Sequence, residues 1–232
     1  GRQVSRMLAR GMAAAGLTVV SGMARGSDSA AHWGALQENG RTFAVLGCGV
    51  DICYPRENMD LYTEISRNGG IISELPPGTR PEGYQFPRRN RIIAALARGI
   101  VVTEAKQKSG TLITVEHGLN LGKEIFAVPG RIDDALSEGC NQLIKAGAKL
   151  VMQPSDILDE FGILAREYKK NNITLDNSEK VVYASICLVP RSADEIALLT
   201  GMEVQNVIHN LISMELKGII HSVGKNQYVL NI

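Results

Sequence analysis

The chain has 232 residues, of which 44% are hydrophobic, and its formal net charge is +1 at pH 7. This length accommodates one or two domains with a sizeable core, and the hydrophobic content excludes an intrinsically disordered chain. No apolar run reaches membrane-spanning length, and the basic residues near the N-terminus lead into no signal-like apolar segment. We therefore expect a soluble cytoplasmic protein.

Six short apolar runs alternate with segments of helical periodicity over the first 165 residues. Strands are predicted at 17–20, 42–46, 71–75, 100–103, 125–128 and 149–152. Helices are predicted at 4–15, 28–36, 58–67, from about 89 to 96, and at 111–121, 141–146 and 156–161. The strand runs are continuously apolar, as expected when helices cover both faces of a parallel sheet. The pattern predicts an α/β fold with an open, doubly wound parallel sheet.

A basic segment lies between Gly78 and Lys108, with seven basic and two acidic residues and hence a net charge of +5. Three of its arginines, Arg88, Arg89 and Arg91, lie within four residues, just ahead of an apolar run. Because Pro87 favours an extended residue before it, we expect a helix to begin near Arg89, with the arginines at its anion-binding N-terminus. The alternative is a solvated run of surface charge.

Two further loops follow predicted strands, at the sheet edge where ligands of such folds bind. Residues 106–111, Lys-Gln-Lys-Ser-Gly-Thr, combine positive charge, a glycine and helix-capping hydroxyl groups, as a phosphate cradle would. No GxxxxGK[ST] sequence is present, which argues against a P-loop nucleotide triphosphatase. The spacing of Gly47 and Gly49 lacks the third glycine of a dinucleotide fingerprint, so a plain turn is the better interpretation.

The other loop runs from Ser21 to Asp28 and also joins a strand to a helix. Ser21 would be a nucleophile only with a base and a GxSxG turn, and no such turn frames it. We expect His32 to be a helix residue with a local hydrogen bond, and Trp33 to be a packing residue. The four cysteines, which form no CxxC pair, are expected to be buried thiols and not a zinc or disulfide framework (Cys48, Cys53, Cys140 and Cys187). We expect no metal and no cofactor.

The composition changes near Ala165, and residues 166–178 have the character of a polar linker. Helices at 180–188, 193–199 and 203–217 and a hairpin at 219–222 and 227–230 then follow in the order of a winged helix. Residues 179–232 carry four basic and five acidic residues, a net charge of −1. Phosphate binding normally requires positive charge, so we expect a protein-contact or regulatory role for this small domain.

Several long segments resemble the DprA/Smf family of bacterial DNA-processing proteins. They read SGMARGSDSAAH from Ser21, FPRRNRIIAAL from Phe86, EAKQKSGTLIT from Glu104, GKEIFAVPG from Gly122 and GCNQLIKAGAKLV from Gly139. The resemblance implies an extended Rossmann-like domain at 1–165 that binds single-stranded DNA, a winged helix at 179–232, and a homodimer. It also implies a non-enzymatic recombination mediator that protects incoming DNA and loads the recombinase RecA during natural transformation.

The resemblance also assigns a nucleic-acid-binding site. One wall is implied by Ser21, Gly22 and Arg25, the phosphate contacts by Arg88, Arg89, Asn90 and Arg91, and the other wall by Lys108, Ser109, Gly110 and Thr111. The chain departs from the family at Ser27, where isoleucine is usual. The family also carries a Gly-Ser-Arg motif on a strand upstream of the position of Gly1, so we expect that first strand to be missing here.

Two other functions compete with this one. Arg89, Arg91 and the segment 109–111 also resemble LOG-type nucleoside-monophosphate phosphoribohydrolases, with Glu116 as the candidate catalytic carboxylate. Lys108 and Ser109 replace the paired glycines of those enzymes, and an exposed helical carboxylate is the simpler interpretation of Glu116. A transcription regulator that uses the winged helix is disfavoured by the acidity of that domain.

Overall fold

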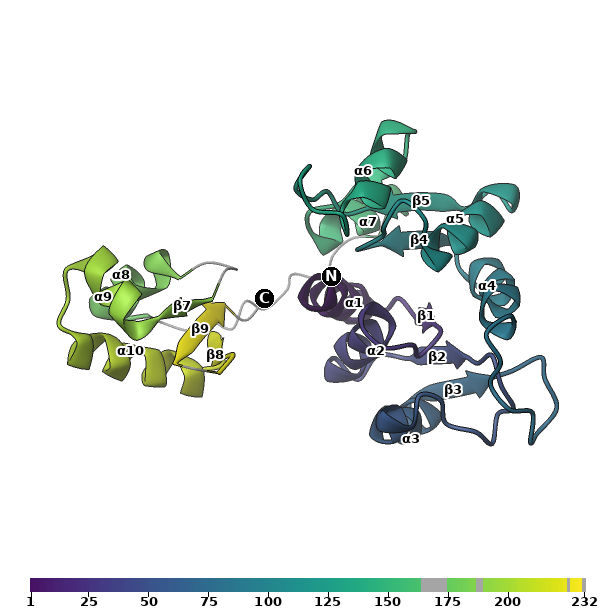
Figure 1. Cartoon of the computed structure of the whole chain (residues 1–232), viewed down its shortest axis with the longest axis horizontal. Helices are drawn as coiled ribbons and strands as arrows, with labels where there is room; N and C mark the ends of the chain where they lie inside the picture. The colour runs from purple at the N-terminus through teal and green to yellow at the C-terminus, as the bar shows by residue number, and fades with distance from the viewer. Residues whose placement is uncertain (164–174, 187–189, 225, 231–232) are drawn as a thin grey trace. The chain divides into compact units, whose positions relative to one another are not determined.

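The computed structural model describes residues 1–163, 175–186, 190–224 and 226–230. The chain divides into two compact units, Gly1–Tyr168 and Lys169–Ile232, and Figure 1 shows the elements of each. Within the described residues, no helix is both long enough and apolar enough to span a bilayer. Most of the predicted linker, from 166 to 174, lies outside the described residues.

The large unit contains two parallel sheets of three strands each. The first has the order β1-β2-β3, and the second has the order β4-β5-β6. Their bounds are Val19–Ser21, Thr42–Val45 and Gly69–Ile72 for the first, and Gly99–Val102, Glu124–Ala127 and Lys149–Leu150 for the second. All four strand pairs are parallel, which confirms the predicted α/β class. Strand pairing is nonetheless divided between two sheets, where the sequence suggested one continuous sheet.

The described part of the large unit has seven α-helices (Figure 1): α1 Arg2–Ala14, α2 Ser27–Gln37, α3 Met59–Arg67, α4 Gln85–Leu96, α5 Gly110–Asn120, α6 Glu138–Lys145 and α7 Pro154–Glu160. A 3₁₀ turn at Arg56–Asn58 leads into α3. Most bounds fall within three residues of the predicted ones. The exception is α4, which begins at Gln85, four residues before Arg89, and therefore includes Pro87 in its first turn. Proline is tolerated there, since the first N–H groups of a helix have no partner within the helix.

Helix α1 packs against elements of both sheets. Ala9 and Ala13 share a buried cluster with Val19 of β1, whereas Leu8 shares one with Phe126 of β5. A polar contact also joins the two halves, because the Ser5 hydroxyl lies 2.7 Å from the hydroxyl of Thr103, the residue after β4. The two sheets therefore belong to one packed unit.

The small unit has its own core and its own antiparallel sheet. Its elements are α8 Asn177–Ser185, β7 Arg191–Ser192, α9 Ala193–Thr200, α10 Val204–Leu216, β8 Ile220–Ser222 and β9 Gln227–Leu230, with the strand order β7-β9-β8. The side chains of Asp176 and Ser192 begin α8 and α9 with capping boxes. The order of helices and hairpin is the one expected of a winged helix, and that assignment stays a prediction. The two-residue strand β7 was not predicted.

Three of the four cysteines lie in the cores of the large unit. Cys48, Cys53 and Cys140 are free and buried, as expected, while Cys187 lies outside the described residues. Burial raises the pKa of each of the three thiols. Trp33 packs against the cluster that contains Leu61 and Ile65, which agrees with its predicted packing role.

Candidate nucleic-acid interface

A continuous path of hydrogen bonds joins the three sequence motifs at the carboxyl ends of the strands. Arg89 on α4 donates to the carbonyl oxygen of Gly22, just after β1, over 2.9 Å. Its Nε also donates to the Asn90 side chain over 3.1 Å, and the Asn90 amide lies 3.5 Å from the carbonyl oxygen of Gly110 in α5. The loop at Gly22, helix α4 and the start of α5 therefore meet at one place, as the sheet topology predicted.

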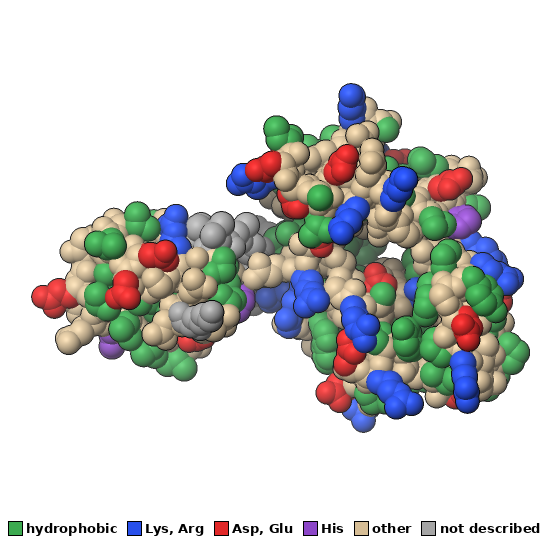
Figure 2. Space-filling view, in the orientation of Figure 1, with side chains coloured by type: hydrophobic (Ala, Val, Ile, Leu, Met, Phe, Trp, Pro, Cys, Tyr) green, Lys and Arg blue, Asp and Glu red, His purple; other side chains and the backbone are tan. Residues whose placement is uncertain are grey.

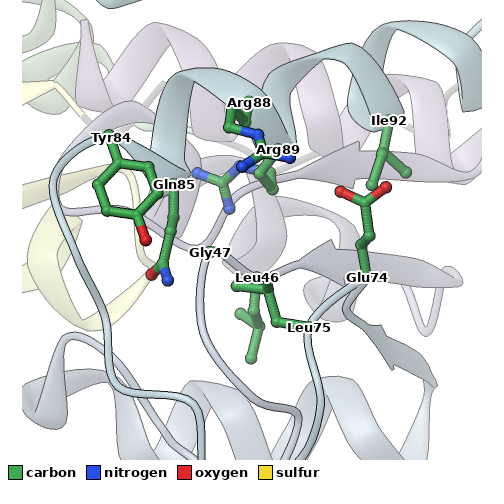
Figure 3. Close-up of a pocket in the computed structure, with 9 residues that line it drawn as sticks. All are labelled: Leu46, Gly47, Glu74, Leu75, Tyr84, Gln85, Arg88, Arg89 and Ile92. Carbon is green, nitrogen blue, oxygen red and sulfur yellow. The ribbon is translucent and has the colours of Figure 1, made fainter.

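Arg89 is placed in the interior and does not point into solvent. Its side chain is 7% exposed, and its guanidinium donates to the main-chain carbonyl oxygens of Gly22 and Val45. Burial lowers its pKa from the usual value. The prediction that three arginines crowd one helix N-terminus is wrong, because α4 starts at Gln85 and only Arg88 and Arg91 are exposed. Figure 3 shows Arg88 and Arg89 on α4, above Leu46 and Gly47.

The loop after β1 is shaped by Asp28, a residue that the sequence did not single out. The Asp28 carboxylate accepts hydrogen bonds from the N–H groups of Gly22 and Ala24, over 3.1 and 3.2 Å. These two N–H groups therefore already have an anionic partner. Arg25, at the exposed tip of the same loop, forms a bidentate ion pair with Glu57, and this hydrogen bonding raises the Arg25 pKa.

Two more arginines of the basic segment already have partners. Arg91 forms an exposed ion pair with Glu74, which precedes the loop to α4. The guanidinium of Arg98 lies 4.7 Å from the centre of the Phe161 ring, a cation–π contact. Arg98 therefore packs against the end of α7, since Phe161 ends that helix.

The remaining cations of the basic segment make no hydrogen bond or ion pair with any residue that the structure describes. They are Arg80, Arg88, Lys106 and Lys108, and all four are exposed. Lys108 precedes the N-terminus of α5, where the Ser109 hydroxyl accepts a hydrogen bond from the Thr111 N–H over 3.2 Å. Gly110 is exposed, with open space where a side chain would stand. Figure 2 shows blue side chains of lysine and arginine spread over the large unit.

A small cavity lies between α4 and the ends of β2 and β3 (Figure 3). Its volume is about 50 Å³, and its lining includes Glu74, Tyr84, Arg88 and Arg89. Ligand pockets for drug-sized molecules usually measure about 300 Å³ or more, so this cavity does not enclose a nucleotide. Tyr84 at its rim is 62% exposed, and the sequence analysis missed this residue because a lone tyrosine in a proline-rich loop carries no periodic pattern.

The residues weighed for catalysis form no hydrogen bonds with one another in the described part of the chain. Ser21 ends β1, and the buried ring of His32 is bonded through Nδ1 to the Thr42 hydroxyl, 2.6 Å away. A local hydrogen bond was expected for His32, and the structure shows instead a bond to Thr42 of strand β2. Glu116 is exposed on α5. Among the described residues, no three His, Cys, Asp or Glu side chains are grouped so as to hold a metal ion.

The fold is that of a Rossmann-like α/β protein. Exposed cations and the N-terminus of α5 lie at the carboxyl ends of its parallel strands. Within that class, the model of the DNA recombination-mediator protein A family matches residues 1–162. The chain belongs to that family, which confirms the resemblance noted in the sequence.

Curated relatives and solved structures agree with the family assignment. DNA processing protein DprA of Streptococcus pneumoniae is 50% identical over 145 residues, or 62% of this chain and 51% of that protein. Protein Smf of Escherichia coli is 38% identical over 233 aligned positions, or 96% of this chain and 62% of that protein. The chain therefore spans only about half to two thirds of these relatives.

Among solved structures, DprA of Streptococcus pneumoniae matches with a TM-score of 0.64 and 45% identity, over 68% of this chain and 56% of that one. DprA of Helicobacter pylori, whose structure is described as showing a single-stranded DNA binding mode, matches with a TM-score of 0.63 and 30% identity. That match covers 69% of this chain and 73% of that one. Both matches support the Rossmann-like fold of the large unit.

Proposed function

We propose that the protein binds the phosphates of single-stranded DNA at the place where the loop at Gly22, helix α4 and the start of α5 meet, and that it serves as a recombination mediator. The observation that carries the proposal is the set of unpaired cations, Arg88 and Lys108 above all, beside loops held in place by Arg89 and Asn90. The single-stranded DNA binding mode named for the Helicobacter pylori relative supports it.

The predicted site residues divide by role in this proposal. Lys108, Ser109, Gly110 and Thr111 offer contacts to phosphates at exposed or half-exposed positions around the α5 N-terminus, and Arg88 offers one from an exposed position on α4. Arg25 and Arg91 would contact phosphates by exchanging their exposed ion pairs with Glu57 and Glu74, which cost little to break. Ser21, Gly22, Arg89 and Asn90 shape the surface and hold the loops together.

We further propose that the protein is cytoplasmic and dimeric, protects incoming DNA and loads RecA during transformation, and is not an enzyme. A non-enzymatic role is supported by the small cavity beside α4 and by His32, whose buried ring is bonded to the Thr42 hydroxyl and not to Ser21. The phosphoribohydrolase alternative would require release of a free base from a nucleoside monophosphate, and loss of that release in Glu116→Gln.

The test is a binding titration with a fluorescent oligothymidine over a series of salt concentrations. For single strands, log K should fall by about 0.7 per phosphate neutralised for each tenfold rise in salt. Arg88→Ala should weaken binding and reduce that slope. The matched control is Arg41→Ala, because Arg41 is exposed but precedes β2, at the amino end of the strand and away from the site. Binding that is independent of salt, or equally tight for duplex DNA, would contradict the proposal.

A further inference from the structure

A row of three arginines lies along the exposed side of α1, outside the DNA site proposed above. Arg2, Arg6 and Arg10 follow one another at four-residue intervals, so they share one side of the helix, and all three are exposed. Consecutive members are about 6 Å apart along the helix axis. Helix α1 contains no acidic residue, and Figure 2 shows blue side chains over the region that Figure 1 labels α1 and α2. We call these three residues the α1 arginine row.

The contacts of the row leave most of its charge available to an anion. Arg2 makes no hydrogen bond or ion pair with any residue that the structure describes. Arg6 donates from Nε to the side-chain oxygen of Gln37 over 3.0 Å, and this partner is neutral. Arg10 forms an ion pair with Glu38 and keeps 46% of its side chain exposed. An exposed pair of this kind is weak, so Arg10 can exchange Glu38 for a phosphate.

The row begins beside the proposed DNA site and leads away from it. Ser5 lies between the first two arginines, and its hydroxyl is 2.7 Å from the hydroxyl of Thr103, just after β4. The loop that follows Thr103 carries the exposed Lys106 and Lys108. At its other end, α1 stops at Ala14, a few residues before β1 begins, so the helix runs from the carboxyl ends of the strands to their amino ends. The row therefore continues the positive charge of the site down one side of the large unit.

We propose that the α1 arginine row is a second phosphate-binding stretch, which holds the part of a DNA single strand that extends beyond the site at α4 and α5. The inference rests on the proposed function and adds a direction in which the strand leaves the site. Guanidinium groups match phosphate oxygens with paired hydrogen bonds, and a flexible single strand can bring successive phosphates to a row of cations. Because α1 has no aromatic side chain to stack on a base, the contacts are to the backbone and are independent of sequence.

An acidic segment of a protein is the competing occupant, since carboxylates also pair with arginine. Continuity with Lys106 and Lys108 favours DNA, because a strand held at those lysines already lies next to the start of α1. A protein segment would gain nothing from that continuity.

The test is a titration of the full chain with fluorescent oligothymidines of increasing length. The double variant Arg6→Ala, Arg10→Ala should bind the shortest oligomers as the unsubstituted chain does, because these fill only the first site. On long oligomers its affinity should fall roughly tenfold, and its salt slope should be lower by about 1.4, the value for two lost contacts to a single strand. Arg88→Ala should weaken the binding of short and long oligomers alike.

Two further variants control for charge and folding. Arg67→Ala is the matched control, since Arg67 is an exposed arginine on α3 with an exposed ion pair to Glu64, and it should leave binding at every length unchanged. Arg6→Lys with Arg10→Lys keeps the charge and should keep most of the affinity for long oligomers. Thermal melts check that each variant is folded.

Three results would overturn the proposal. If the double alanine variant lost no affinity for long oligomers, the row would be solvated surface charge. If it lost equal affinity at every length, the row would belong to the first site. If polyglutamate displaced long oligothymidine from the unsubstituted chain as effectively as unlabelled oligothymidine does, the row would be assigned to an acidic protein partner. Failure of the proposed function would look different, because the unsubstituted chain would then bind no oligothymidine of any length.

Discussion

Arg89 and Gly22, 67 positions apart in sequence, are joined by a 2.9 Å hydrogen bond from the arginine Nη1 to the glycine carbonyl oxygen. The same guanidinium donates to the carbonyl oxygen of Val45, at the end of β2. One buried side chain thus fixes α4 against the ends of two neighbouring strands. Arg88 and Arg91, the exposed arginines of α4, are carried by the helix that this contact fixes.

Arg89→Ala should destabilise the protein by at least about 2 kcal/mol, because it leaves two carbonyl oxygens beside a void without their donor. Arg91→Ala is the matched comparison, since its ion pair with Glu74 is exposed and contributes less than about 1 kcal/mol. Urea unfolding at neutral pH measures both changes. Equal stability losses would mean that the buried hydrogen bonds of Arg89 stabilise the fold no more than the exposed ion pair of Arg91.

Gly22→Ala should also destabilise the large unit, and its effect should be coupled to Arg89. A methyl group at Gly22 would lie 2.5 Å from Cζ of Arg89, which forces the guanidinium or the loop to move. In the double variant with Arg89→Ala that clash is absent, so the two losses should not add. A double-mutant cycle of unfolding free energies gives the coupling, and additive losses would contradict the contact.

Ser109 offers a way to separate helix capping from DNA contact. Ser109→Ala should cost about 1 kcal/mol of stability, because the Thr111 N–H loses its cap. Ser109→Asp should keep the cap and the stability, yet weaken single-strand binding by placing a negative charge where phosphates are proposed to bind. Thermal melts and the oligothymidine titration measure the two effects. Unchanged affinity in Ser109→Asp would move the DNA path away from α5.

Stability should fall as the pH is lowered through the range in which free histidine takes up a proton. Burial lowers the pKa of His32 from 6.5 to about 4, so below pH 6.5 the unfolded chain binds a proton that the folded chain does not. Thr42 donates its hydroxyl proton to the carbonyl oxygen of Val19, so Nδ1 of His32 carries its own proton, and Nε2, which is buried without a partner, would have to take the charge.

The expected loss is about 2 kcal/mol between about pH 7 and pH 5, measured by urea unfolding. His32→Asn, which retains a donor near the position of Nδ1, should be less stable throughout but should show a flatter pH dependence. Carboxylates with a lowered pKa, such as Glu179, lose their contribution only at lower pH. An unchanged slope in His32→Asn would assign the pH dependence to another group.

In the small unit, Lys217→Met should lower the melting temperature more than Lys180→Met. The Glu179 carboxylate is 1% exposed and is bonded by Lys217, the Ser213 hydroxyl and the Asp176 N–H. These hydrogen bonds, with Lys217 first, lower the Glu179 pKa, and removal of the ammonium group leaves a buried carboxylate without its counter-charge. Lys180 is exposed on the same helix as Glu179. Adding Glu179→Gln to Lys217→Met should recover part of the loss.

The sequence predicted the parallel α/β class and the meeting of three loops, because both follow from the period and order of apolar runs. It did not predict which arginine is buried. Arg88 and Arg89 are neighbours in sequence but are 100° apart around α4, so one faces solvent and the other faces the strands. The order of charged residues in the sequence does not show which side chain is buried. The sequence analysis also placed the start of the helix after Pro87, whereas α4 includes that residue.

Other features that the sequence did not predict depend on contacts between segments or are too short to produce a pattern. The division of the strands into two sheets depends on pairing between distant segments, which periodicity does not report. The role of Asp28 depends on the fold of the loop after β1, and β7 is too short to produce an alternating pattern. The site residues taken from the family resemblance remain predictions, and the variants above test them.

Helix α1 has a consequence for synthesis on the ribosome. Leu8 shares its buried cluster with Phe126, Val151 and Ile157, so the last of these partners is made almost 150 residues later. At about 5 to 20 residues per second, this apolar surface waits roughly 7 to 30 s for Ile157 to be made. The half built on β1 to β3 can pair its strands early, whereas the joining of the two halves is a late step of high contact order. During that interval the nascent chain offers α1 as a binding surface for chaperones.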